Sequence, residues 1–501
     1  MKKAFSITLI CIFLLILYTQ KLQSNFDILI HDDVFVLFDD FKGFFNDFIY
    51  AYHGRFLTNT LAHIIAVSIP LKFNIHPIEW MQSGAVFVKS IFIFCICFLI
   101  PSTCVILQNK TEKVSLKNYI LIPIFTLLLY FFYQNAFISN YASFLYMSFY
   151  GFTLPFIPFF IFWQIILKTY LSDEFNFSKN KLYLTALLAF VVGYSSEFFS
   201  FSTFASLTFL TVFWGIKKSK KLKNQLIIYV ANILGLALYV SLPGFGRTCE
   251  EKIFISFSSI QSFINWFFET VQNLEMLVIK EYLPFILITA ILFCILIFSK
   301  KENKNKKITA SLIYLLGILS FYFTMSLVKR HFPNAEEADY QFLIHFDIIQ
   351  QMKIALLFLI SVQLSFLAEK KAVYNTITAV LLIYSITLTW NNIKDTTRLL
   401  VKKQKTEYTQ KWANHTVDEY VRRYYAEKKI LEAVENNEQI ILTNLDIDPN
   451  CFVDNFDVYM AKIYGISVPR NNVKIESTAN DNIEPLLKEQ VNFNDLMKYK
   501  R

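Results

Sequence analysis

The chain has 501 residues, of which 55% are hydrophobic and only 17% are charged, whereas a soluble protein of this size carries about 25% charged residues. Several apolar runs reach the roughly 18–20 residues that a helix needs to cross a bilayer. The composition therefore excludes an ordinary soluble enzyme and indicates a polytopic α-helical membrane protein. The net charge of +9 does not indicate a nucleic-acid partner, because the lysines cluster in short loops between apolar runs, as membrane topology favours.

Apolar windows with basic flanks predict about eleven membrane-spanning helices. The first begins like a signal peptide, but no small-residue cleavage site follows its apolar core, so we expect it to remain as a helix. The runs at 182–196 and 199–215 are separated by a very short turn, and they are either a helical hairpin or one long bent segment. The expected spans are 4–20, 82–107, 118–134, 148–168, 182–196, 199–215, 225–243, 282–299, 308–328, 345–368 and 372–390.

The distribution of lysine predicts the orientation of these spans. Lys2 and Lys3 precede the first span, and every second loop after it is basic: 109–117, 168–181, 217–224, 300–307 and 369–371. Because cytoplasmic loops carry the excess of basic residues, we expect the N-terminus in the cytoplasm. An odd number of spans then places the C-terminal tail on the extracytoplasmic side of the cell inner membrane.

The first outer loop, 21–81, is the longest loop between spans and is rich in acids. Aromatic residues at helical spacing within 35–52 predict an amphipathic helix that lies at the membrane interface. Its polar face carries acids that we expect to be solvated scaffold: Asp39, Asp40 and Asp47. A second amphipathic stretch is expected over 55–72, with His63 on its polar side.

From Asn391 onward the sequence becomes charged and helix-prone. The run EQIILTNL predicts a strand at 439–444, and VYMAKIYGISV predicts a short helix followed by an extended run. We therefore expect a transmembrane domain over 1–390 and a small extracytoplasmic α+β appendage over 391–501.

Asp32 and Asp33, which directly precede the first interfacial helix, are the expected catalytic residues. A carboxylate at the membrane edge can accept a proton from a hydroxyl, or it can bind a divalent cation that neutralises a phosphate. The alternative is that one of the two caps the helix and the other is solvated. Metal binding thus stays open, with these two aspartates as the ligands if Mg²⁺ or Mn²⁺ is used.

Further polar side chains in outer segments fit a substrate that carries a phosphate and a sugar. Arginine grips a phosphate through two parallel hydrogen bonds, and a carboxylate between two apolar runs usually faces the interior of a bundle. Instead of binding a substrate, these side chains could anchor the protein at the membrane interface, belong to an aromatic belt or lie in a surface turn. The expected substrate-binding residues are His53, Arg55, Asn140, Glu197, Arg247, Arg330 and His331.

The arrangement resembles the GT-C superfamily of integral-membrane glycosyltransferases. The resemblance lies in one span followed by a long outer loop that starts with an Asp-Asp pair, then many spans and an outer C-terminal appendage. More narrowly, the chain is similar to bacterial multi-pass proteins grouped with O-antigen glucosyltransferases. The matching pieces are HDD (31–33), the GR of YHGRFLTN (54–55), the Glu of SSEFF (197), LPGFGR (242–247) and MAKIYGISV (460–468). Phe245 stands where an Asn is expected after the PG of the fourth piece.

The resemblance implies an enzyme of the cell envelope that moves a sugar from a polyprenyl-phosphate donor to a surface glycan or a lipid-linked acceptor, as in lipopolysaccharide O-antigen modification. A lipid-linked donor needs no nucleotide-binding fold, which agrees with the lack of GxxxxGK[ST] and GxGxxG sequences. Four alternatives remain open: an O-antigen polymerase, a lipid-linked-sugar flippase, a multi-pass transporter and a structural membrane protein.

Overall fold

The computed structural model describes fourteen main stretches of the chain: 2–24, 56–81, 83–108, 122–130, 149–171, 178–217, 222–242, 285–298, 304–329, 354–366, 423–443, 456–468, 473–476 and 491–500. Isolated helical positions at 261–262, 265 and between 372 and 387 are also described. These stretches are mostly helical.

Four of the described helices are long and apolar enough to cross a membrane. They are Lys3–Lys21 within α1 (Lys2–Ser24), Pro77–Leu107 over α6 (Pro77–Met81) and α7 (Gly84–Gln108), Phe198–Ile216 within α13 (Glu197–Ile216) and Leu222–Ser241, which is α14. They coincide with the expected spans 4–20, 82–107, 199–215 and 225–243. The chain is thus a mostly helical membrane protein, as its composition predicts.

Shorter apolar helices lie within other expected spans. They are Phe156–Tyr170 of α11 (Phe156–Leu171), Phe285–Ile297, Lys307–Ser320 of α17 (Lys304–Lys329) and Ile354–Phe366. Their described lengths do not establish membrane crossing, so the total of eleven spans stays a prediction.

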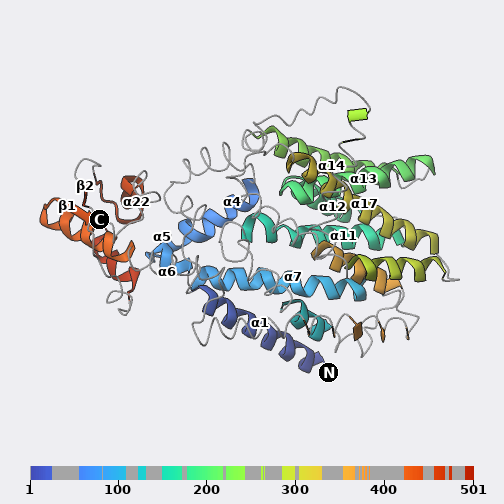
Figure 1. Cartoon of the computed structure of the whole chain (residues 1–501), viewed down its shortest axis with the longest axis horizontal. Helices are drawn as coiled ribbons and strands as arrows, with labels where there is room; N and C mark the ends of the chain where they lie inside the picture. The colour runs from blue at the N-terminus through green and yellow to red at the C-terminus, as the bar shows by residue number, and fades with distance from the viewer. Residues whose placement is uncertain are drawn as a thin grey trace.

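The expected pair of spans at 182–196 and 199–215 forms two separate helices. Here α12 (Lys179–Gly193) ends at Tyr194, and α13 begins after Ser196, whose backbone is extended with φ −166° and ψ 173°. An extended residue interrupts helical geometry, so one continuous bent helix is excluded. The helix α12 packs mainly against α14, and α14 lies beside both helices in Figure 1.

Two glycines permit the closest helix contacts of the bundle. A Cβ atom at Gly235 of α14 would collide with the carbonyl oxygen of Phe190 of α12, and one at Gly317 of α17 would collide with Ser206 of α13. Small residues at such crossings let helix backbones approach in membrane proteins. These two positions therefore fix how α14 and α17 sit against the α12–α13 pair.

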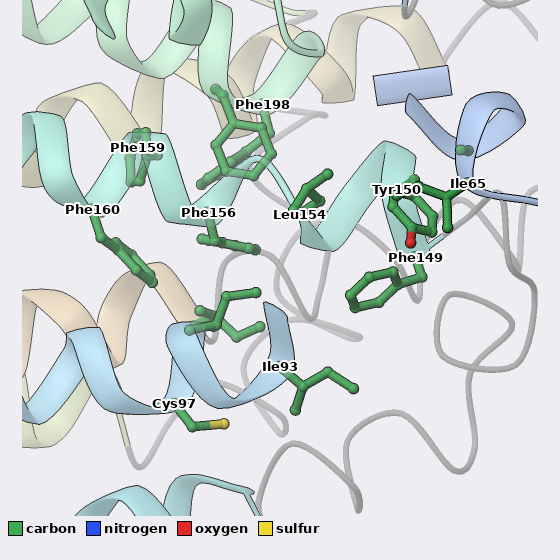
Figure 2. Close-up of a cluster of buried hydrophobic side chains, with 14 of the residues drawn as sticks. Ile65, Ile93, Cys97, Phe149, Tyr150, Leu154, Phe156, Phe159, Phe160 and Phe198 are labelled. Carbon is green, nitrogen blue, oxygen red and sulfur yellow. The ribbon is translucent and has the colours of Figure 1, made fainter. Parts of the chain in front are cut away.

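The core of the bundle is largely aromatic. Phe156 and Phe160 of α11 pack against α13 and the helix 354–366, with centroid distances of 4.8 Å to Phe199 and 4.6 Å to Phe358. Figure 2 shows Phe156, Phe159 and Phe160 projecting from α11, with Phe198 beside them. Packing of this kind adds specific geometry to apolar burial.

The second amphipathic stretch of the first loop is helical, as predicted. It consists of α4 (Phe56–His63), a π-helical segment η2 (Ile64–Ser68) and α5 (Ile69–Lys72). The helix stops at Phe73, and Asn74 adopts the left-handed conformation with φ 56°, which asparagine tolerates better than most residues. The chain then enters α6 and α7.

The described residues after 422 form a compact group that we call the C-terminal unit. It contains a helix over 423–436, β1 (Ile440–Thr443), α22 (Phe456–Tyr464), β2 (Val473–Glu476) and the 3₁₀ helix η7 (Phe493–Tyr499). The strands pair in parallel, with Ile440 opposite Val473, and α22 lies in the crossover that a parallel pair requires. Strand β1 and helix α22 occur where the sequence predicts them, whereas β2 was not expected.

The C-terminal unit lies beyond one end of the helical bundle (Figure 1). It is next to α5 and α6, at the end where α1 finishes and α7 begins. Residues at the two extremes of the sequence therefore meet there.

Candidate functional site

The expected catalytic pair, Asp32 and Asp33, lies outside the described residues. The same holds for the expected substrate-binding residues His53, Arg55, Asn140, Arg247, Arg330 and His331. Glu197 is described through its backbone, as the first residue of α13. Whether these side chains share one site therefore stays a prediction.

The described residues do place several buried polar groups at the end of the bundle that faces the C-terminal unit. Lys89 lies in the first turns of α7 and is only 6% exposed. Its Nζ atom is 5.5 Å from the ring centroid of Phe149, which belongs to the π-helical segment η3 (Phe149–Thr153). This segment also packs against α4 of the first loop. A cation is thus held between the bundle and the first loop.

The turn before Glu197 lies next to the same layer. Phe156, which closely follows η3, has its ring 6.1 Å from that of Phe198. The hydroxyl oxygens of Thr153 and Ser196 are buried and have no hydrogen-bond partner among the described residues. We call this group, from Lys89 through Thr153 to Ser196, the junction.

Two features of the junction are typical of functional sites. Both π-helical segments of the described chain, η2 and η3, lie in or beside it, and π-helical turns are frequent at such sites. Buried hydroxyls without partners carry a desolvation penalty that proteins otherwise avoid. The hydroxyls of Thr153 and Ser196 are therefore polar groups that no hydrogen bond among the described residues satisfies.

Sequence reasoning missed Lys89, although the signal was present. It is a single charge inside the apolar run 82–107. An ionisable residue at membrane depth is expensive and generally functional, so that rule would have selected it.

A second polar cluster, the seam, joins the C-terminal unit to the first loop around the fully buried carboxylate of Glu427. Its Oε1 atom accepts hydrogen bonds from the Tyr459 hydroxyl at 2.6 Å and from Arg423 Nε at 3.2 Å. Its Oε2 atom accepts one from the Tyr464 hydroxyl at 2.6 Å and lies 3.4 Å from His76 Nε2. Both oxygens are therefore saturated by donors.

The hydrogen bonds of His76 define its tautomer. Its Nδ1 atom accepts the backbone N–H of Ile78 at 3.3 Å, so Nε2 carries the proton and points toward Glu427. Burial raises the pKa of the Glu427 carboxyl, but its neighbours, His76 foremost, outweigh burial and hold that pKa below its ordinary value. The carboxylate is thus ionised in this environment.

Burial and the Glu427 charge raise the pKa of both the Tyr459 and the Tyr464 phenol well above the ordinary value. The two phenols therefore remain protonated donors to the carboxylate. Tyr464 lies in the sequence element MAKIYGISV, and its contact with Glu427 gives this element a structural role.

Further hydrogen bonds join the C-terminal unit to the residues around His76 in the first loop. The Asn494 Oδ1 atom accepts the His76 backbone N–H at 3.0 Å, and the Glu79 Oε1 atom accepts the Phe493 N–H at 2.8 Å. His63, expected on the polar side of its helix, is buried, and its Nε2 atom lies 3.4 Å from Lys462 Nζ. The polar face of this stretch is therefore covered by the C-terminal unit.

The two clusters differ in what they can do chemically. The seam is saturated and serves to hold the unit, whereas the junction combines a cation with hydroxyls that lack partners. No group of three or more His, Cys, Asp or Glu residues within the described stretches is placed to hold a metal ion.

Comparison with known proteins adds no further information. No family model, no curated protein and no solved structure matches the chain. The functional argument therefore rests on the residues and their geometry.

Proposed function

We propose that the protein is a membrane glycosyltransferase that moves a sugar from a polyprenyl-phosphate donor to a cell-surface glycan or a lipid-linked acceptor. The observation that carries the proposal is the buried cation Lys89, which lies beside the first-loop helices at one end of an apolar bundle. A donor anchored in the bilayer would present its phosphate at that level.

The depth of Lys89 suits this role. It lies five residues after Gly84, where α7 begins, which is about 7–8 Å along a helix axis. Headgroup phosphates occupy the polar layer outside a hydrocarbon core about 30 Å thick. A lysine near the end of a span reaches that layer while its stem stays among apolar side chains.

The position of the C-terminal unit supports the proposed orientation. The unit contacts His76 and Glu79, which follow the first span, and these contacts support placing it on the same side of the membrane as the first loop. That placement would agree with an odd number of membrane crossings between Met1 and residue 423. An N-terminus in the cytoplasm would put both the first loop and the C-terminal unit outside, where lipid-linked donors are used.

In the proposed reaction, one group of residues acts on the attacking hydroxyl and another group acts on the leaving phosphate. Asp32 or Asp33 accepts the proton of the acceptor hydroxyl, whose oxygen attacks the anomeric carbon of the sugar. The bond to phosphate breaks, and polyprenyl phosphate leaves with the electron pair. Lys89 stabilises this leaving phosphate, together with the outer cations His53, Arg55, Arg247, Arg330 and His331.

Typical rate contributions support the use of both a general base and fixed positive charges. A positioned general base contributes about 10²–10⁴-fold in rate. Fixed charges aimed at the group where negative charge develops often contribute more than that. Asn140 and Glu197 are proposed to bind hydroxyl groups of the sugar.

The test uses a strain that lacks the gene and is complemented with single variants. Asp32→Asn and Asp33→Asn are expected to insert normally, and at least one of them loses sugar transfer to the surface glycan. Asp47→Asn, on the expected scaffold face, serves as the matched control and retains transfer. Full activity in both test variants would refute the assignment, and loss of polymer with single repeats retained would indicate a polymerase instead.

A further inference from the structure

The C-terminal unit carries a hollow of about 540 Å³ on its surface, which falls in the range of ligand pockets. One side is formed by Tyr424 and Lys428 of the helix 423–436. The other side is formed by η7 and its C-terminal end, through Asn494, Asp495, Leu496, Lys498 and Tyr499. Two tyrosines and two lysines thus border the hollow from two different elements.

The aromatic groups of the hollow are held by packing. The Tyr424 ring meets Phe493 edge-on at 5.5 Å, and the Phe493 ring packs against the His76 ring in a tilted arrangement, with their centroids 4.8 Å apart. Lys498 Nζ lies 4.9 Å from the Tyr499 ring centroid. Rings fixed in this way offer apolar faces to the C–H groups of a sugar, and their hydroxyls stay available for hydrogen bonds.

The charges of the hollow favour an anion. Lys428, Lys498 and Asp495 are the charged residues that line the hollow, so the lining has one more basic than acidic group, while the Glu432 carboxylate acts on Tyr424 from outside the lining. Burial, followed by the Asp495 carboxylate, raises the pKa of the Tyr424 phenol, and the phenol is therefore a neutral donor. The hollow combines donors for a negatively charged group with acceptors for hydroxyls.

The hollow also adjoins the first loop. Asn494, which lines it, accepts the backbone N–H of His76, and the preceding Phe493 donates to Glu79. A molecule bound in the hollow therefore lies next to the loop that carries the expected catalytic pair.

We infer that this hollow binds a negatively charged saccharide, one that bears carboxylate or phosphate groups, and that it receives the acceptor glycan. The acceptor role rests on the proposed glycosyltransferase function, whereas the binding itself does not. The tyrosine rings contact sugar faces, the lysines pair with the anionic groups, and Asn494 and Asp495 bind hydroxyls.

The experiment measures binding without donor or catalysis. Full-length protein in nanodiscs of neutral lipid is titrated with fluorescently labelled tetragalacturonate and with maltotetraose, a neutral saccharide of equal length. We expect the anionic saccharide to bind more tightly and to weaken as salt rises. Lys428→Gln combined with Lys498→Gln is expected to weaken its binding about two- to thirtyfold, as the loss of two solvent-accessible ion pairs predicts.

Two control variants separate binding from folding. Lys428→Arg combined with Lys498→Arg retains the charge and should retain binding. Lys500→Gln removes a lysine that does not line the hollow and should leave the Kd unchanged. Equal binding of both saccharides, or an unchanged Kd in the double Gln variant, would overturn the inference.

A third arm addresses anionic lipid as the occupant. Nanodiscs that contain phosphatidylglycerol should bind tetragalacturonate through the same two lysines. If that lipid instead abolishes the lysine-dependent binding, the hollow is a lipid site and the inference fails. Saccharide binding without any sugar transfer in the complementation test would reject the proposed enzyme while leaving the binding site intact.

Discussion

Replacing Glu427 with Gln should destabilise the C-terminal unit and, through the loss of its contact with His76, weaken the attachment of the unit to the first loop. The carboxylate accepts from two phenols at 2.6 Å and pairs with Arg423 at 3.2 Å. Glutamine keeps the volume but removes the charge, which leaves a buried guanidinium without its anion. Breaking a buried pair in this way costs about 3–5 kcal/mol, and each 1.4 kcal/mol changes an equilibrium tenfold. The population of the opened C-terminal unit should therefore rise by roughly 10²- to 4 × 10³-fold.

Hydrogen exchange of the full-length protein in nanodiscs measures this change. Amides of the helix 423–436 and of α22 should exchange faster by that factor, because exchange reports the free energy of opening. Glu435→Gln is the matched control, since Glu435 is exposed on the same helix. A surface substitution of this kind changes stability by about 0.5 kcal/mol at most.

Exchange in Glu427→Gln equal to that of the wild type would refute the reasoning. It would mean that the seam contributes nothing to docking and that apolar contacts alone hold the unit. Tyr459→Phe provides a graded check, because loss of one hydrogen bond to a charged group costs about 1.5–3 kcal/mol. Its exchange should lie between those of the wild type and Glu427→Gln.

Three further outcomes are expected. The folded-state pKa of the Glu427 carboxyl is lowered, so its stabilising contribution is complete above the ordinary glutamate pKa of about 4.3 and is lost as pH falls through the folded-state pKa. Protease resistance of the C-terminal unit should therefore persist at pH 5 and fall at lower pH, and Glu427→Gln should show no such acid step. Gly235→Val should destabilise the bundle by about 1–3 kcal/mol through overpacking, seen as a lower Tm, whereas Gly215→Val, where a Cβ meets nothing, should not. Lys89→Met should raise the KM for the lipid-linked donor about 10–150-fold, as the loss of a charged hydrogen bond implies, whereas Lys89→Arg should retain most of the affinity. Equal KM values in the two variants would contradict a contact between Lys89 and the donor phosphate.

The features that the sequence predicted correctly depend on local patterns. Apolar length alone identifies α1, α7, α13 and α14 as candidate spanning helices, and the short run EQIILTNL identifies β1. Amphipathic spacing likewise predicts the helix over α4 to α5. These patterns do not depend on contacts between distant parts of the chain, and the helices and the strand that they predict are therefore present in the structure.

The seam could not be predicted in the same way. His76 and Glu427 are widely separated in the chain, and each is unremarkable in its own segment. His63 shows the consequence: its spacing indicates the polar side of a helix, but nothing in the sequence shows that this residue is buried and contacts Lys462 of the C-terminal unit. Only the tertiary contact reveals that a polar stripe is an interface.

The candidate site was predictable in part. The charge of Lys89 within an apolar run is visible in the sequence, whereas its contact with Phe149 of η3 joins segments that are distant in the chain. Asp32 and Asp33 remain sequence-based assignments. The helices that precede and follow them in the chain are α1 and α4, and the end of α1 and the whole of α4 lie at the end of the bundle that holds the junction.

A transfer assay in proteoliposomes tests the central claim most directly. Purified protein is supplied with a polyprenyl-phosphate hexose labelled in the sugar and with a glycan acceptor, and parallel reactions contain the corresponding nucleotide sugar. The account predicts that label moves to the acceptor from the lipid-linked donor alone, with release of polyprenyl phosphate. Transfer from the nucleotide sugar, or translocation of the lipid-linked sugar across the bilayer without transfer, would contradict it.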